Sequence, residues 1–367
     1  FLGAPKIKNF KFQGVSAADK LTGMTTNLFD VTVPNYNDDD IAAIKGANSN
    51  GELQGDKLTT IATDFLGYGY IGINADNVKV GEDKGSEESK ALRRGIATLM
   101  SVYRESVVYA YYGDRAAIIQ YPISNTSWAA PKAADEGYQL AYSVDVEGNQ
   151  LYTADMTEED KYAVAVEAAR GYLEAAGYTF DANGVATAAP AGASLSYEVL
   201  IPADGTGDHP AYGILTAAKD ELASLGITLD ITDLSDTTQL WDSLEAGTCE
   251  MWAAAWQATV DPDMYQIYYS TNVATNAEGT GSNHYYIQDE NLDSMIMEAR
   301  STTDQAYRKS LYKECLEVIL DWGVELPLYQ RQNAIIFSTE RVNMETVTPD
   351  ITTFWGWMSD IELLEMN

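Results

Sequence analysis

Cysteine, histidine and basic residues are scarce in this chain of 367 residues. It has two cysteines, two histidines, and 23 lysines and arginines against 55 aspartates and glutamates. Two cysteines, Cys249 and Cys315, are too few for a disulfide framework in a chain of this size. Cys315 lies on the apolar stripe of a predicted helix, so we expect a buried thiol there rather than a catalytic one.

The excess of acidic residues leaves a formal charge of -32, which argues against two classes of partner. This charge would repel the phosphates of nucleic acid and the headgroups of an anionic membrane surface. It could attract cationic ligands, but a solvated acidic coat that keeps an exported protein soluble accounts for it more simply. Apolar runs long enough to span a bilayer are also missing from the sequence.

The parts of a metal site or a catalytic triad are missing as well. Neither His209 nor His284 has a second ligand at metal-site spacing, or a nucleophile in a suitable context. We therefore expect no metal, no cofactor and no catalytic residues. His209 precedes Pro210 and is typical of a helix entry, whereas His284 lies among polar and aromatic residues and could touch a ligand.

Two other motifs have a functional and a structural interpretation. Gly67, Gly69 and Gly72 have the spacing of a dinucleotide fingerprint, but they lie inside a predicted strand instead of opening a helix, so nucleotide binding is disfavoured. Asp261 and Asp263 could be a carboxylate pair for acid–base chemistry. The step from Asp261 to Pro262 also fits an N-cap followed by proline at the first helical position, and we favour capping.

Periodicity along the first half of the chain predicts alternating strands and helices. A capping box at Thr157 and Asp160 opens one of these helices, which Gly177 ends. The predicted strands are around residues 7–12, 28–33 and 68–74, and the helices run over 87–104 and 157–177. A polar stretch occupies 37–54, and a loop with short strands is expected over 121–152.

The second half has a more regular pattern, which predicts parallel βαβ units. Strands at 195–201, 227–232 and 249–256 alternate with helices at 215–225 and 236–246, and helices at 289–300 and 303–322 precede a strand at 334–337. Ligands bind outside the carboxyl ends of parallel strands, so the loop that leaves the third strand, 256–261, should edge a pocket. Trp256 offers it a large apolar face with one donor.

The order of these segments resembles the extracellular solute-binding proteins of the oligopeptide and dipeptide type, family 5. The resemblance rests on the start of the chain (residues 1–7, FLGAPKI), on 70–74 (YIGIN) followed by 91–96 (ALRRGI), on 170–178 (RGYLEAAGY), on Trp256 with Asp261-Pro262-Asp263, and on 325–329 (ELPLY). It extends over nearly the whole chain.

The resemblance implies an α/β, periplasmic-binding-protein-like (type II) lobe with a mixed β-sheet flanked by helices. Residues 1–327 would form lobe II and residues 328–367 would return to lobe I, of which an earlier segment is expected before residue 1. Such a protein is extracellular, on the cell surface or in the periplasm, and is no enzyme. It closes two lobes on a peptide or other small-molecule ligand and delivers it to an ABC permease, with membrane association only through a lipid anchor outside this chain.

The predicted ligand-binding residues are Ala255, Trp256, Gln257, Thr259, Asp261 and His284. The resemblance implies that the first three offer backbone contacts to an extended ligand, whereas His284 is included because of its polar and aromatic surroundings. Thr259 stands where peptide binders of the family have an aspartate that pairs with the peptide's amino group. Either Asp261 takes this role through a shift of two residues, or the ligand lacks a free amine. Two rival functions remain: a hydrolase that uses Asp261 and Asp263, and a structural or adhesive surface protein, although internal repeats that would favour the latter are missing.

Overall fold

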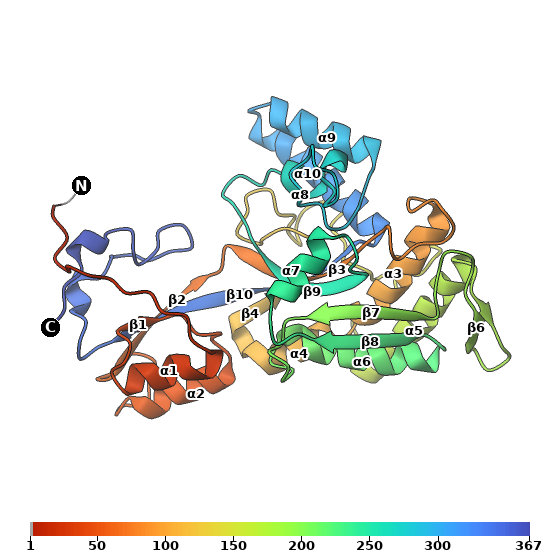
Figure 1. Ribbon diagram of the computed structural model, residues 1–367. Coiled ribbons are helices and arrows are strands. Elements are labelled where there is room, and N and C mark those ends of the chain that lie inside the picture. The colour runs from red at the N-terminus through yellow and green to blue at the C-terminus, as the bar shows by residue number, and fades with distance from the viewer. Residues whose placement is uncertain (1–2) are drawn as a thin grey trace. The chain divides into compact units, whose positions relative to one another are not determined.

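The structure, a computed structural model that describes residues 3–367, divides into two compact units (Figure 1). Unit 1 contains the described residues up to Leu66 together with Tyr109–Ala117 and Gln330–Asn367, and unit 2 contains Gly67–Val108 and Ile118–Tyr329. The end of unit 2 falls two residues from the predicted boundary at 327/328. The described residues up to Leu66, however, cluster with the C-terminal segment and not with the rest of the predicted lobe II.

Unit 1 is built on the second part of the long strand β10 (Glu325–Ser338). This part pairs antiparallel with β2 (Leu58–Asp64) on one edge and with β1 (Val31–Thr32) on the other, which explains why early and late segments assemble together. Helices α1 (Ala17–Thr25) and α2 (Asp38–Ala47) cover one face of these strands through Met24 and Ile44. Two short 3-10 helices, Met344–Thr346 and Ile361–Leu363, follow β10.

Unit 2 is a mixed α/β layer structure around a five-stranded arrangement in the order β10-β3-β9-β7-β8. Strand β3 (Gly67–Ile73) is antiparallel to both β9 (Met251–Gln257) and the first part of β10, whereas β7 (Ser196–Ile201) is parallel to β8 (Thr228–Asp233) and β9. The parallel βαβ series and the mixed sheet predicted from the sequence are therefore confirmed. All seven residues of β3 are buried, and it has a strand on each side, so β3 is an interior strand of this core.

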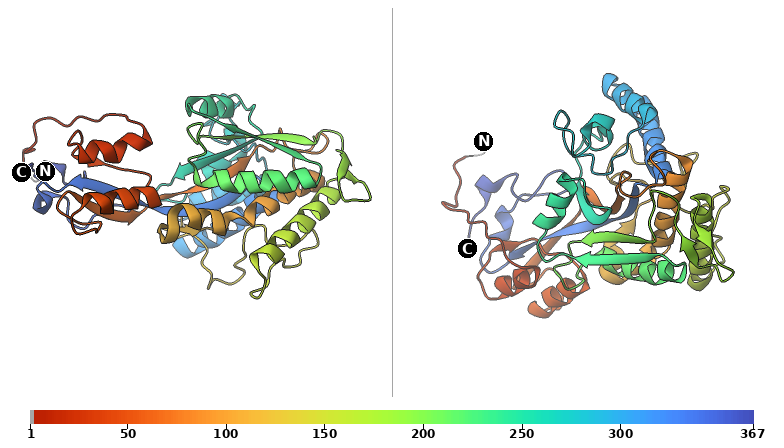
Figure 2. Two further views of the ribbon diagram at one scale, coloured as in Figure 1. Left: turned by 90° about the horizontal axis from the view of Figure 1, so that it is seen from below. Right: turned by 45° about the vertical axis from the view of Figure 1, so that its right-hand side comes forward.

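Helices flank the strands of unit 2 (Figures 1 and 2). Helix α6 packs beside β8, α3 packs against α5, and α9 and α10 lie side by side. Their bounds are α3 Glu87–Ser101, α5 Glu158–Ala175, α6 Pro210–Ser224, α7 Thr238–Glu245, α8 Tyr265–Tyr268, α9 Glu290–Ser301 and α10 Gln305–Trp322. The remaining elements of the described chain are α4 (Arg104–Tyr112), the 3-10 helices Gly113–Arg115 and Ser270–Asn272, β4 (Ala116–Ile118), and a hairpin of β5 (Thr179–Phe180) and β6 (Ala186–Ala188).

The structure confirms several local predictions and corrects others. The capping box of Thr157 and Asp160 opens α5, and the His209 side chain caps α6 by accepting a hydrogen bond from the Ala211 amide. Cys249 and Cys315 are both buried free thiols. The polar stretch at 37–54, for which no helix was predicted, contains α2, whose capping box of Asn37 and Asp40 lies in a run of acidic residues.

The strand predicted around residues 7–12 is wrong. Residues 3–16 form no helix or strand, and Phe12 is 75% exposed, because alternating apolar residues make a strand only where a neighbouring strand supplies hydrogen bonds. Phe1 and Leu2, with which the family motif at the start of the chain begins, lie outside the described residues.

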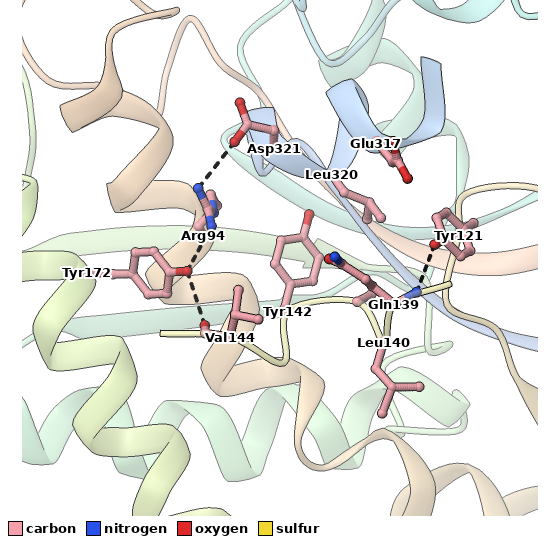
Figure 3. A pocket seen from close by; sticks show the side chains of 11 residues that line it. Arg94, Tyr121, Gln139, Leu140, Tyr142, Val144, Tyr172, Glu317, Leu320 and Asp321 are labelled. Atoms are coloured by element: carbon pink, nitrogen blue, oxygen red, sulfur yellow. Dashed lines mark hydrogen bonds and ion pairs between the residues drawn. The ribbon is translucent and has the colours of Figure 1, made fainter. Parts of the chain in front are cut away.

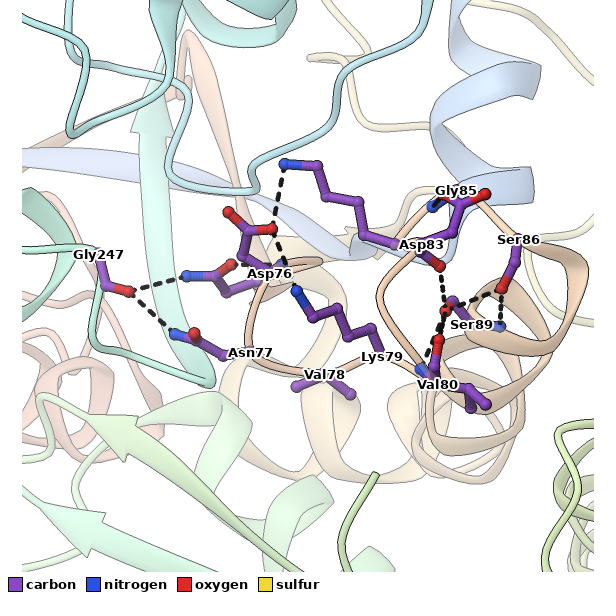
Figure 4. Close-up of polar contacts among 12 residues, drawn as sticks. Asp76, Asn77, Val78, Lys79, Val80, Asp83, Gly85, Ser86, Ser89 and Gly247 are labelled. Carbon is purple, nitrogen blue, oxygen red and sulfur yellow. Dashed lines mark hydrogen bonds and ion pairs between the residues drawn. The ribbon is translucent and has the colours of Figure 1, made fainter. Parts of the chain in front are cut away.

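The loop between β3 and α3 is tied down by side-chain hydrogen bonds (Figure 4). Asn77 donates to the carbonyls of Gly247 and Cys249 at 2.9 and 3.0 Å. Ser89 donates to the Asp83 carbonyl at 2.7 Å and accepts from the Val80 amide. These bonds anchor the start of α3 to the strands of unit 2.

Arg93, on the next turn of α3, is fully buried and forms no ion pair within residues 3–367. Its guanidinium instead donates to three carbonyls, of Trp322 at 2.7 Å and of Val78 and Lys84 at 2.9 Å each. Burial lowers the pKa of Arg93 to about 9. One side chain thus joins the end of α10 to the loop that precedes α3.

Replacing Arg93 with methionine should therefore lower the free energy of unfolding by about 3 kcal/mol, because three buried carbonyls lose a charged donor. The matched control is Arg94→Met on the same helix. Arg94 forms a partly exposed ion pair with Asp321, so its loss should cost at most about 1 kcal/mol. Urea unfolding of the two variants measures the difference, and equal costs would contradict the role assigned to Arg93.

Candidate ligand-binding site

A small pocket opens at the end of β9, where the chain leaves the strand. Its volume is about 120 Å³. This is well below the roughly 300–1,000 Å³ of a site that encloses a whole small molecule, so the pocket can take one side chain or one end of a ligand. The pocket is lined by residues of β3, of β9 and the loop after it, of α8 and of the loop after β4: Tyr68, Pro122, Ile123, Ser124, Ser127, Trp256, Gln257, Ala258, Thr259, Asp261, Pro262, Asp263, Met264 and Tyr268.

Trp256 belongs to a layer of stacked aromatic rings. Its indole lies parallel to the ring of Tyr70, with centroids 5.6 Å apart and 7° between the planes, and its Nε1 donates to the Tyr285 hydroxyl at 3.0 Å. The ring of Tyr285 in turn stacks on Tyr268 at 5.5 Å. The rings hold Trp256 in one orientation at the pocket wall.

Glu325 lies under this aromatic layer and is completely buried. Its Oε2 accepts a hydrogen bond of 2.7 Å from the hydroxyl of Tyr268, which lines the pocket. The surroundings are otherwise apolar or phenolic, and burial raises the pKa of Glu325 to about 7. The protonation of Glu325 is therefore coupled to the orientation of a pocket side chain.

The edge of β9 next to the pocket is only partly paired. Its parallel register with β7 covers Met251 and Trp252 alone, whereas its antiparallel register with β3 continues to Gln257. Because the Asn74 amide bonds to the Glu250 carbonyl, the alternation of an antiparallel ladder turns the backbone groups of Ala255 and Gln257 away from β3. Both residues are exposed, so this edge can pair with an added strand.

The loop after β9 does not follow the capping interpretation of the sequence. Helix α8 begins at Tyr265, and Met264 occupies the N-cap position. Asp261 instead forms an ion pair with Arg308 on α10 at 2.7 Å, and Asp263 forms one with Arg300 on α9 at 3.2 Å. Capping by Asp261 is wrong because α8 begins four residues later and the Asp261 carboxylate binds Arg308 instead. Asp263 does lie at the helix start, where its Oδ1 accepts a hydrogen bond of 3.1 Å from the Tyr265 amide.

The structure brings four of the six predicted ligand-binding residues together in the pocket: Trp256, Gln257, Thr259 and Asp261. Ala255 lies beside them on β9, with its side chain on the opposite face of the strand from that of Trp256. His284 is buried away from this pocket, with its ring 6.3 Å from that of Trp241. Tyr68, Tyr268 and the residues of 122–127 also line the pocket and were not predicted, because no local motif marks them.

A second pocket of about 170 Å³ lies elsewhere in unit 2, between α3, α5, α10 and the segment 139–144 (Figure 3). Arg94 lies in its wall, paired with Asp321 at 3.2 Å and with the Tyr172 hydroxyl at 2.9 Å. The Tyr121 hydroxyl accepts from the Gln139 amide. The polar groups of this pocket bind one another, which makes it a weaker candidate than the pocket beside β9.

Over residues 3–367, three or more histidine, cysteine, aspartate or glutamate side chains do not gather anywhere in a way that could hold a metal ion. None of the helices in this range has the length and apolar composition needed to cross a membrane.

Comparison with known families gives a match over most of the chain. The model described as "Bacterial extracellular solute-binding proteins, family 5 Middle" matches residues 2–278. The chain belongs to this family. No curated protein sequence matches the chain.

Solved structures share the fold of this family 5 protein, and with it the type II periplasmic-binding-protein-like class. The oligopeptide-binding protein AppA from Bacillus subtilis, in complex with a nonapeptide, has a TM-score of 0.67 and 17% identity over 96% of this chain and 58% of its own. DppA from Helicobacter pylori, in complex with the peptide STSA, has a TM-score of 0.64 and 15% identity over 95% and 55%. NikZ from Campylobacter jejuni, in complex with Ni(L-His), has 0.64 and 16% over 94% and 59%. The chain thus spans less than two thirds of the length of these proteins.

The buried carboxyl group of Glu325 predicts a pH dependence of stability. Below about pH 4.5 the group is protonated in both the folded and the unfolded chain. Between about 4.5 and 7 only the unfolded chain releases the proton, so stability should fall as the pH rises, by about 3 kcal/mol in total.

Glu325→Gln should remove this contribution and flatten the fall in unfolding free energy between about pH 5 and pH 8, as measured by urea unfolding. Glu317→Gln, at a half-exposed position on α10, is the matched control and should leave the profile unchanged. A variant of Glu325 with the pH profile of the original protein would show that the carboxyl group is not held protonated.

Proposed function

We propose that this family 5 protein is the substrate-binding component of an ABC importer, outside the cytoplasm, and that it captures oligopeptides or dipeptides by closure of two lobes. The proposal assigns the ligand-binding lobe to unit 2, which ends within two residues of the predicted boundary, and the segment after it to the other lobe. It includes an ABC permease as partner and no bond-making or bond-breaking chemistry.

The observation that carries the proposal is the free edge of β9 beside an aromatic pocket. An extended peptide can add to such an edge through main-chain hydrogen bonds while a side chain enters the adjoining pocket. Ala255 and Gln257 supply the edge and Trp256 supplies the wall. AppA and DppA, which share the fold, were solved with peptides, whereas NikZ was solved with a nickel complex of histidine.

A hydrolase that uses Asp261 and Asp263 fits the contacts less well. Both carboxylates are already paired with arginines, so neither is left without a partner to act on a substrate. A structural or adhesive role would need neither the pocket nor the free strand edge. A ligand that co-purifies with the protein would therefore argue against such a role.

Native mass spectrometry of the full-length protein, purified gently, tests the function directly. Co-purified masses that resolve into peptides would support the proposal. Sugars or other metabolites would keep the binding-protein class and overturn the peptide assignment. A protein that is empty and gains no thermal stability from a mixture of short peptides would favour the structural role.

Trp256→Ala should weaken peptide binding at least about tenfold, because a tryptophan that fills a binding pocket contributes more than most contacts around it. The matched control is Trp241→Ala, which removes a tryptophan that is 40% exposed on α7 and does not line the pocket. Calorimetry with a peptide found by mass spectrometry measures both affinities. Unchanged binding in the Trp256 variant would remove this loop from the site.

A further inference from the structure

Both carboxylates at the mouth of the pocket are bound to arginines of the same unit. Asp261 Oδ1 lies 2.7 Å from Nη2 of Arg308, and Asp263 Oδ2 lies 3.2 Å from Nε of Arg300. Thr259 carries no charge, and its hydroxyl donates to the carbonyl of Asp261 at 2.6 Å. Among residues 3–367, Asp261 and Asp263 are the only aspartates, glutamates, lysines, arginines or histidines that line the pocket. Once paired, they leave its mouth with no net charge.

Arg308 is held in place by more than its carboxylate partner. The guanidinium lies 5.4 Å from the ring centroids of both Trp128 and Tyr312, and its Nη2 also donates to the Tyr312 hydroxyl at 2.8 Å. The side chain is only 16% exposed. An arginine stacked on aromatic rings keeps its partner with little further loss of side-chain freedom.

A free ammonium group that entered the pocket would compete with this arrangement. To gain a full charge–charge contact with Asp261, it would have to displace the Arg308 guanidinium from its carboxylate and leave that guanidinium without its charged acceptor. If it did not displace Arg308, it would meet a pair whose charges cancel. The side-chain amide of Gln257, by contrast, suits an uncharged polar group.

We propose that Arg308 neutralises Asp261, so that the part of the ligand in this pocket carries no free ammonium group. The inference rests on the proposed function and narrows its substrate class to ligands that place an acylated amine, an amide or an uncharged side chain here. It thus selects the second of the two alternatives that the sequence left open, a ligand without a free amine at this position.

Two pools of random short peptides without lysine, one with free amino termini and one N-acetylated, test the inference on the full-length protein. Each pool is offered at equal concentration, and the retained peptides are quantified by mass spectrometry. The original protein should retain the acetylated pool at least as well as the free one. Arg308→Gln should shift the ratio toward free amines by about tenfold, since it leaves a carboxylate able to bind an ammonium group.

Three variants sharpen the test. Lys309→Gln removes the neighbouring charge, which is paired with Asp135 instead of Asp261, and should leave the ratio unchanged. Arg308→Lys keeps a positive charge and should shift the ratio less than Arg308→Gln. Adding Asp261→Asn to Arg308→Gln should abolish the shift, and if Arg308→Gln does not fold, the ratio for the original protein still decides.

The outcomes separate the two proposals. A preference of the original protein for free amines of tenfold or more would overturn the neutral pocket and leave peptide binding intact. An unchanged ratio in a folded Arg308→Gln variant would also overturn it. Retention of neither pool would overturn the peptide function and, with it, the inference that rests on it.

Discussion

The aromatic layer under the pocket depends on two positions of β3 that have no room for a side chain. A Cβ on Gly72 would lie 2.3 Å from the Trp252 ring, and one on Gly69 would lie 2.5 Å from the ring of Tyr329. The space at Gly72 lets the Trp252 ring lie across β3, where its Nε1 donates to the hydroxyl of Tyr70. The ring of Tyr70 in turn stacks on that of Trp256. Glycines that have the spacing of a nucleotide fingerprint thus serve the packing of rings on the neighbouring strands.

Charge inside unit 2 is arranged very differently from charge in the chain as a whole. The formal charge of -32 belongs to the surface, whereas the deepest cations have carbonyl partners. Arg104, which is buried, donates to the carbonyls of Pro327 and Ile119, as Arg93 does to three others. At the pocket mouth each carboxylate is paired with an arginine, so the charges cancel. Beneath the pocket, burial raises the pKa of Glu325 and favours its neutral form. Net charge therefore says little about what the site binds.

The sequence was sufficient for elements whose signals are local. The strands and helices between residues 195 and 257 have clear alternation, helical spacing and glycine stops, and the structure has them nearly where they were predicted. Helix α2 was not predicted, because its apolar side is marked by a single buried residue, Ile44. The strand expected at 7–12 failed for the opposite reason, since its pattern is right and a pairing partner is missing within the described residues.

The site was predictable only as far as one loop. Trp256 and its neighbours follow a parallel strand, which is a rule that a sequence can express. Tyr68, Tyr268 and Arg308 reach the same place from elements far apart in the chain, and local rules assign them no function. The capping rule at Asp261 was satisfied locally and still wrong, because the competing arginine comes from α10.

The position of β3 in the sequence also has a consequence for synthesis of the protein. Gly72 pairs with Trp252 on one side and with Glu325 on the other, so its neighbours are translated 180 and 253 residues later (252 - 72 and 325 - 72). At about 5–20 residues per second, the first neighbour follows after roughly 10–40 s. During that time a strand that is buried at every position of the finished fold has neither edge covered. The nascent chain therefore has a long interval in which this segment must be shielded by something other than its own partners.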